Sequence, residues 1–142
     1  MTTTIRVRAC LAVVQDERLL LVPHYQTDAG AVQWNIPGGG VEFGEALELA
    51  VLREFTEETG LQAQITGILT ITEVIQPEKP WHSITITFAG ALTDRISDGQ
   101  LLPEIHPTYG QKVPQWFTTE AVRQVAYHPK PAVEKALKIH LP

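Results

Sequence analysis

Three carboxylates within five residues stand out in this chain of 142 residues: Glu54, Glu57 and Glu58. They lie near the end of a run of good helix formers from about residue 45 to residue 59. At roughly 100° per residue they share a helix face. The same face continues an apolar stripe that is formed by Leu47, Ala50 and Val51.

A cluster of like charges on an apolar helix face indicates a metal site. Each neighbouring pair of carboxylates costs a few tenths of a kcal/mol even in water, and burial increases that cost. A hard divalent cation resolves the repulsion, because Mg²⁺ takes oxygen ligands and favours sites shared by carboxylates and phosphates. The alternative is a solvated acidic helix end, but acids at a helix C-terminus oppose the helix dipole. We therefore favour metal binding.

The segments around the helix predict how it is held. Residues 37–40, Pro-Gly-Gly-Gly, predict a turn before the helix. Gly60 suits the left-handed position that follows a helix C-terminus. Leu49 and Leu52 point away from the acidic face, so we expect the helix to be covered on more than one side.

The spacing of these residues resembles a known motif. Gly39, Glu45, the pair Arg53-Glu54 and the pair Glu57-Glu58 occupy every fixed polar or glycine position up to Gly60, and the hydrophobic positions are filled by Phe55 and Leu61. This pattern, over residues 39–61, resembles the box of the Nudix hydrolases, in which an aliphatic residue is commoner than Phe55. Trp34 before the glycines and residues 116–117, Trp-Phe, extend the resemblance over most of the chain.

The resemblance implies a fold and a reaction. It implies one domain over residues 1–142, of the α+β class, built as an α/β/α sandwich with a mixed central sheet. The implied reaction is divalent-metal-dependent cleavage of a diphosphate bond in a nucleoside diphosphate linked to another group. An alternative is a sensor of the same fold that binds a nucleotide or ADP-ribose without turnover. Such a protein would be expected to lack box carboxylates, and all are present here.

The same resemblance implies the metal ligands. They are the carboxylates of Glu54, Glu57 and Glu58 with the backbone carbonyl of Gly38, and the ion is Mg²⁺ or Mn²⁺. A glycine at position 38 lets the backbone approach the ion closely.

Catalytic roles fall to neighbouring residues. Arg53 either orients Glu54 or pairs with Glu45, which also lies favourably at the helix start. The general base is Glu54, Glu57 or a carboxylate from the long segment 94–111, where Glu104 is the best candidate.

Substrate contacts are predicted outside the motif. Tyr25 and Trp34 are candidates to stack on a base, although packing of Trp34 in the core is the favoured interpretation. We place His82 near the substrate. Pro77 follows Leu61 by 16 residues, a spacing associated with ADP-ribose pyrophosphatases, whereas the compact chain is more similar to members that cleave nucleoside triphosphates. We leave these two substrate types level.

Composition limits the classes of partner that the chain is expected to bind. A net charge of −5 argues against a duplex DNA or RNA partner but not against a small nucleotide, whose phosphates a metal ion can neutralise. No apolar run reaches the length of a membrane span. The single cysteine, Cys10, allows no internal disulfide and fits a reducing cytoplasm. A homodimer is only the default expectation for an oligomer.

Periodicity predicts the remaining elements. Alternation or continuous apolar character predicts strands at 5–14, 18–23, 62–75 (bent at Gly67), 82–92 and 113–117. Helices are expected at 119–126, capped by Thr118 or Thr119, and at 131–139. Polar composition predicts loops at 25–33 and 94–111.

Overall fold

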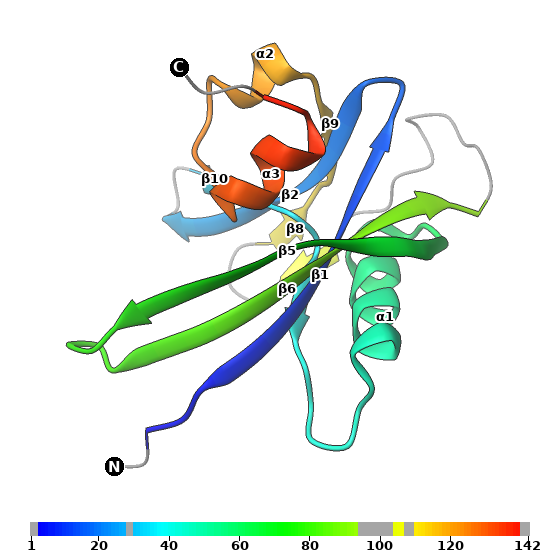
Figure 1. The fold of residues 1–142 in the computed structure, drawn as a ribbon. Helices are drawn as coiled ribbons and strands as arrows, with labels where there is room; N and C mark the ends of the chain where they lie inside the picture. Colours follow the sequence, from blue (N-terminus) through cyan, green and yellow to red (C-terminus); the bar gives the residue numbers. More distant parts are fainter. Residues whose placement is uncertain (1–2, 28–29, 94–103, 107–109, 140–142) are drawn as a thin grey trace.

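The computed structural model describes residues 3–27, 30–93, 104–106 and 110–139. One mixed sheet runs through this part of the chain, with helices packed on it (Figure 1). Its strands follow the order β10, β3, β2, β1, β6, β5, while β4 pairs with β1 and β9 pairs with β2. The bounds are β1 (Arg6–Gln15), β2 (Arg18–Thr27), β3 (Gly30–Asn35), β4 (Gly38–Gly40), β5 (Ala63–Gln76), β6 (Trp81–Leu92), β9 (Gln115–Phe117) and β10 (Tyr127–His128). The predicted α+β fold with a mixed sheet is confirmed.

Strand β1 is the centre of the sheet. It pairs antiparallel with β2 and β4 and parallel with β6. Its alternate residues enter two separate cores. Ala9, Leu11 and Val13 face helix α1 (Leu47–Thr59), and Cys10 and Ala12 face helix α3 (Lys130–Ala136). The two-residue turn to β2 has positive φ at Asp16 and Glu17, which suits the twist of a tight hairpin.

Helix α1 buries a stripe that is rotated from the predicted one. Val51 and Phe55 are fully buried against β1, whereas Leu47 is 36% exposed. Each buried side chain of this kind stabilises the fold by roughly 1.5–3 kcal/mol. Leu49 is 66% exposed, so the expectation of cover on a second side is wrong for it. One side of α1 packs on the sheet, and Leu49 lies away from that side.

Two predicted loops contain strands, and so does the predicted turn at residues 37–40, where β4 pairs with β1. Residues 25–33 were expected to be a loop, but β2 extends to Thr27 and pairs antiparallel with β3, which begins at Gly30. The segment 94–111 holds two short paired strands, β7 (Glu104–His106) and β8 (Gly110–Lys112). In both loops, pairing between strands that follow each other in the chain overrides the polar composition.

The other strands and helices form where they were predicted, with shifts in their bounds. Strand β5 has register shifts on either side of the segment 67–68, which confirms a bend at Gly67. Helix α2 (Thr119–Val122) is shorter than predicted, and its cap Thr118 accepts a hydrogen bond from the Ala121 amide. It ends early because residues 127–128 join the sheet as β10 beside β3. No helix in the described ranges is long and apolar enough to cross a membrane.

Candidate active site

The site forms where strand β4 meets helix α1. Gly38 and Gly39 pair with Cys10 and Ala9 of β1, so the glycine segment is fixed to the central strand. The Gly38 amide donates a hydrogen bond to Glu58 Oε2 at 3.3 Å. A Cβ atom on Gly39 would lie 2.7 Å from the Glu54 carboxyl carbon. The glycines therefore let two acidic side chains of α1 lie directly against the backbone of β4.

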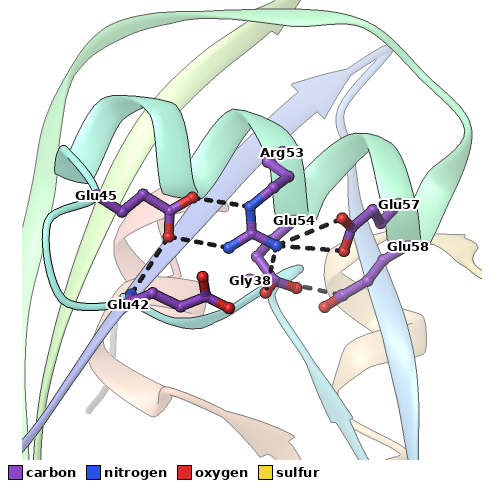
Figure 2. Close-up of polar contacts among 7 residues, drawn as sticks. All are labelled: Gly38, Glu42, Glu45, Arg53, Glu54, Glu57 and Glu58. Carbon is purple, nitrogen blue, oxygen red and sulfur yellow. Dashed lines mark hydrogen bonds and ion pairs between the residues drawn. The ribbon is translucent and has the colours of Figure 1, made fainter.

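Arg53 is the centre of the polar contacts (Figure 2). Its Nε and Nη2 donate to the two oxygens of Glu45 at 2.8 and 3.0 Å. Its Nη1 donates to Glu54 Oε1 at 3.2 Å and approaches both oxygens of Glu57 at 3.4 Å. Of the two roles predicted for Arg53, pairing with Glu45 and contact with Glu54 are both present.

The electrostatics of this cluster are unbalanced. Three carboxylates, Glu45, Glu54 and Glu57, contact the Arg53 guanidinium, and a fourth, Glu58, lies against Gly38 (Figure 2). The hydrogen bonds from Arg53 lower the pKa of Glu45 below its ordinary value. The same hydrogen bonds, which Glu45 accepts, raise the pKa of Arg53. The cluster therefore carries more negative than positive charge, which suits binding of a cation.

Burial differs sharply among the three predicted metal ligands. Glu58 is only 9% exposed, and the side chains of Glu54 and Glu57 are 21% and 54% exposed. Figure 2 shows Glu54 and Glu58 next to Gly38 and Glu57 at the outer end of the helix. The prediction that all three carboxylates continue the buried stripe is therefore wrong for Glu57, whose side chain faces solvent.

The carboxylate oxygens are the type of ligand that a hard cation prefers, but the side chains are not arranged around a common point. The described residues contain no group of three His, Cys, Asp or Glu side chains that could hold an ion as they stand. Arg53 contacts Glu54 and Glu57, and Glu58 accepts from the Gly38 amide. The contacts from Arg53 to Glu57 are the longest of the set and its carboxylate is the most exposed. Of the carboxylates that Arg53 contacts here, Glu57 is therefore the less closely held.

The predicted substrate residues do not gather at this cluster. Trp34 packs against the α3-side core, with its ring 4.9 Å from that of Phe117 in an edge-on contact. This is the core position that was favoured for it. His82 lies on β6 near the β5–β6 turn, where its Nε2 is 2.6 Å from Glu73 Oε2. The side chains of Tyr25 and Glu104 lie outside the described residues, and only their backbones, in β2 and β7, are placed.

One contact of the site was not anticipated from the sequence. The Glu42 amide donates to Glu45 Oε1 at 3.3 Å, which closes the turn between β4 and the helix. Glu42 stands three residues before Glu45, a spacing at which a carboxylate reaches back to a free backbone amide. That spacing was the available signal.

Comparison with known proteins decides the family. The family model described as NUDIX domain matches residues 4–138. The chain belongs to the Nudix family. Among solved structures, a MutT Nudix hydrolase from Burkholderia pseudomallei aligns with a TM-score of 0.70 at 24% identity, over 96% of this chain and 98% of that one. A Nudix hydrolase from Nitrosomonas europaea aligns at 0.72 and 23% identity, over 95% and 87%. These likenesses show the Nudix fold.

Curated relatives of this Nudix chain carry several activities in their names. An RNA pyrophosphohydrolase from Novosphingobium aromaticivorans is 38% identical over 44% of this chain and 40% of its own length. An ADP-ribose pyrophosphatase from Methanocaldococcus jannaschii is 33% identical over 54% and 44%. The NAD-capped RNA hydrolase NudC from Vibrio vulnificus is 30% identical over 93% and 46%. The chain spans about half the length of these relatives, and their names agree with the enzyme class that the motif predicted.

Proposed function

We propose that this Nudix chain is a divalent-metal-dependent pyrophosphohydrolase that cleaves a diphosphate bond in a nucleoside diphosphate linked to another group. The observation that carries the proposal is the cluster in which Arg53 contacts Glu45, Glu54 and Glu57 beside the glycines of β4. Family membership supports it, because the relatives with names of known activity act on phosphoric anhydrides.

In the proposed reaction, the residues of the cluster have different roles. Glu54, Glu57, Glu58 and the Gly38 carbonyl would hold Mg²⁺ or Mn²⁺, which supplies neutralisation of phosphate charge and a more acidic bound water. Glu54 or Glu57 would accept the proton from the attacking water. Arg53 orients Glu54 and keeps Glu45 ionised through its hydrogen bonds. The carboxylate of Glu54 lies between Gly39 and the guanidinium of Arg53. These two neighbours limit the directions from which it can accept a proton.

The runner-up is a Nudix-fold sensor that binds ADP-ribose or a related nucleotide without turnover. The complete set of box carboxylates disfavours it, since binding alone does not need an ionised base held in place by an arginine. Residues with hydrolytic roles would be free to change in a sensor.

A substrate panel tests the proposal. The panel comprises nucleoside triphosphates, oxidised dGTP, ADP-ribose, NADH, dinucleoside polyphosphates and sugar nucleotides, each with and without Mg²⁺. We expect Mg²⁺-dependent release of phosphate, pyrophosphate or a mononucleotide from at least one of them. Binding of a panel member without any release of product would support the sensor instead.

A further inference from the structure

A partly buried arginine, Arg8, lies on β1 next to strand β4, whose Gly39 contacts the carboxylate of Glu54. Arg8 pairs through its backbone with Gly40 of β4 on one side and Thr85 of β6 on the other. Its side chain continues the row of Cys10 and Ala12, so it lies on the α3 side of the sheet. Arg8 is partly buried, and Thr85 beside it is buried.

The charge on Arg8 has no anionic partner in the described part of the chain. No hydrogen bond or ion pair within those ranges involves its guanidinium, although the protein carries 16 acidic residues against 11 basic ones. Its charge acts instead on Cys10 and His128, two groups whose pKa shifts favour their uncharged forms. Burial first, and then the charges of Arg8 and His24, lower the pKa of His128. A partly desolvated cation with no anionic partner is costly unless an anion completes the site.

The space beside Arg8 is open and adjoins the glycine segment. A hollow of about 480 Å³ is lined by Arg6 and Arg8 of β1, by Gly40 and Glu42, and by four apolar residues, Ile5, Val7, Val41 and Phe43. Arg6 lies two residues before Arg8 on the same strand face, and its guanidinium lies 4.5 Å from the centre of the Trp81 ring. A Cβ atom on Gly40 would meet nothing within 4 Å. The hollow can therefore receive a ligand group beside Arg8.

Strand β4 connects the hollow to the carboxylate cluster. Gly39 packs on Glu54, and Gly40, the next residue, lines the hollow. In the described structure β4 pairs with β1 alone, so its other edge is not covered by a strand. An elongated ligand can cross the glycines at this edge and reach the acidic side chains of α1 with one end and Arg8 with the other.

We propose that Arg8 binds a phosphate of the substrate that is not part of the cleaved diphosphate bond. This rests on the proposed function and narrows its substrate class to nucleoside triphosphates or other chains of three or more phosphates, in preference to ADP-ribose. A guanidinium suits this role because its planar donors bind phosphate oxygens in pairs.

Steady-state kinetics of Arg8→Ala and Arg8→Lys test the proposal. The substrates are one nucleoside triphosphate, nucleoside triphosphates with other bases, and ADP-ribose. For triphosphates, Arg8→Ala should raise KM at least about tenfold with kcat changed by less than about threefold, and Arg8→Lys should recover part of the loss. The kcat/KM for ADP-ribose should stay within about twofold. Arg18→Ala is the matched control, because Arg18 lines a different hollow and lies over Trp116.

Other outcomes overturn the proposal. An equal loss for the triphosphate and ADP-ribose, no loss for either, or a loss that depends on the base would each do so. Thermal unfolding of each variant shows whether it is folded. Calorimetric binding of a methylene-bridged nucleoside triphosphate to the native protein and Arg8→Ala gives a reading that does not need turnover. Weaker binding by the variant supports the phosphate site even if no panel member is cleaved, and that result would separate this inference from the proposed reaction.

Discussion

Arg53 binds Glu45 through two parallel hydrogen bonds, Nε to Oε2 at 2.8 Å and Nη2 to Oε1 at 3.0 Å. This bidentate geometry fixes the plane of the guanidinium. The remaining nitrogen, Nη1, is thereby directed at Glu54 and Glu57. Glu45 precedes the helix and the other acids lie in its last two turns, so one arginine links the start of the motif to its reactive end.

The Glu45–Arg53 pair predicts a pH dependence of stability. Because the pKa of Glu45 is lowered in the folded protein, its contribution is present above the ordinary value of 4.5 and is lost as the pH falls through the folded value. Glu45→Gln should therefore unfold at lower urea concentration than the native protein at neutral pH. The difference should vanish in acid. Urea titrations across this range measure it, and a difference that grows as the pH falls would contradict the assignment.

Replacement of Arg53 by lysine should impair turnover more than stability. Lysine keeps the charge but cannot donate to Glu45 in a bidentate fashion while also contacting Glu54. We expect kcat/KM to fall by about 10- to 100-fold, as for other groups that orient reactive carboxylates. Arg123→Lys, in an exposed position after α2, is the control. Native activity in Arg53→Lys would show that the guanidinium geometry is dispensable.

The three glycines of β4 should respond differently to alanine. In Gly38→Ala the new Cβ would lie 2.3 Å from the Ala9 carbonyl oxygen, which is backbone and cannot move freely. We expect a loss of about 1–3 kcal/mol in the free energy of unfolding. In Gly39→Ala the clash is with the Glu54 carboxylate, so stability should hold while kcat falls. Gly40→Ala, with open space around the new atom, should change stability by less than about 0.5 kcal/mol.

Thermal or urea unfolding, paired with kinetics, separates the glycine effects. The informative case is Gly39→Ala. If it unfolds far more easily than the native protein and its residual activity is normal, Gly39 serves the fold and does not position Glu54.

Cys10 should be inert in the native protein. Burial of the thiol raises its pKa to about 12, and its side chain is 4% exposed. Because the thiolate is the reactive form, Ellman's reagent at mildly alkaline pH should label it only at the rate of unfolding. Labelling in urea above the transition provides the control, and rapid labelling of the native state would show that Cys10 is accessible.

Much of the site could be predicted from the sequence because it depends on local spacing. Glu54, Glu57 and Glu58 are neighbours on any helix, and Gly60 takes the left-handed C-terminal position with φ of 77°. The rotation of the buried stripe towards Phe55 could not be read from α1 alone, since it depends on where β1 presents Ala9 and Leu11. A helix with apolar residues on several sides has more than one possible packing face.

Features that depend on distant pairing were harder to predict. Strand β3 has no clear alternation, and it is a strand because β2 and β10 pair with it on both sides. The alternation of Arg6 and Arg8 indicates a strand with one polar face. It does not reveal that β4 and β6 enclose the second arginine and leave the first exposed.

The most direct test of the account is the rate of diphosphate cleavage, with Mg²⁺, by Glu57→Gln and Glu58→Gln on the best panel substrate. Glu48→Gln, an exposed acid in the first turn of the same helix, is the matched control. We predict that kcat falls at least about 100-fold in the first two variants, that Glu48→Gln keeps native turnover, and that all three remain folded. Native turnover in both Glu57→Gln and Glu58→Gln would contradict the assignment of the acidic end of α1 as the catalytic metal site.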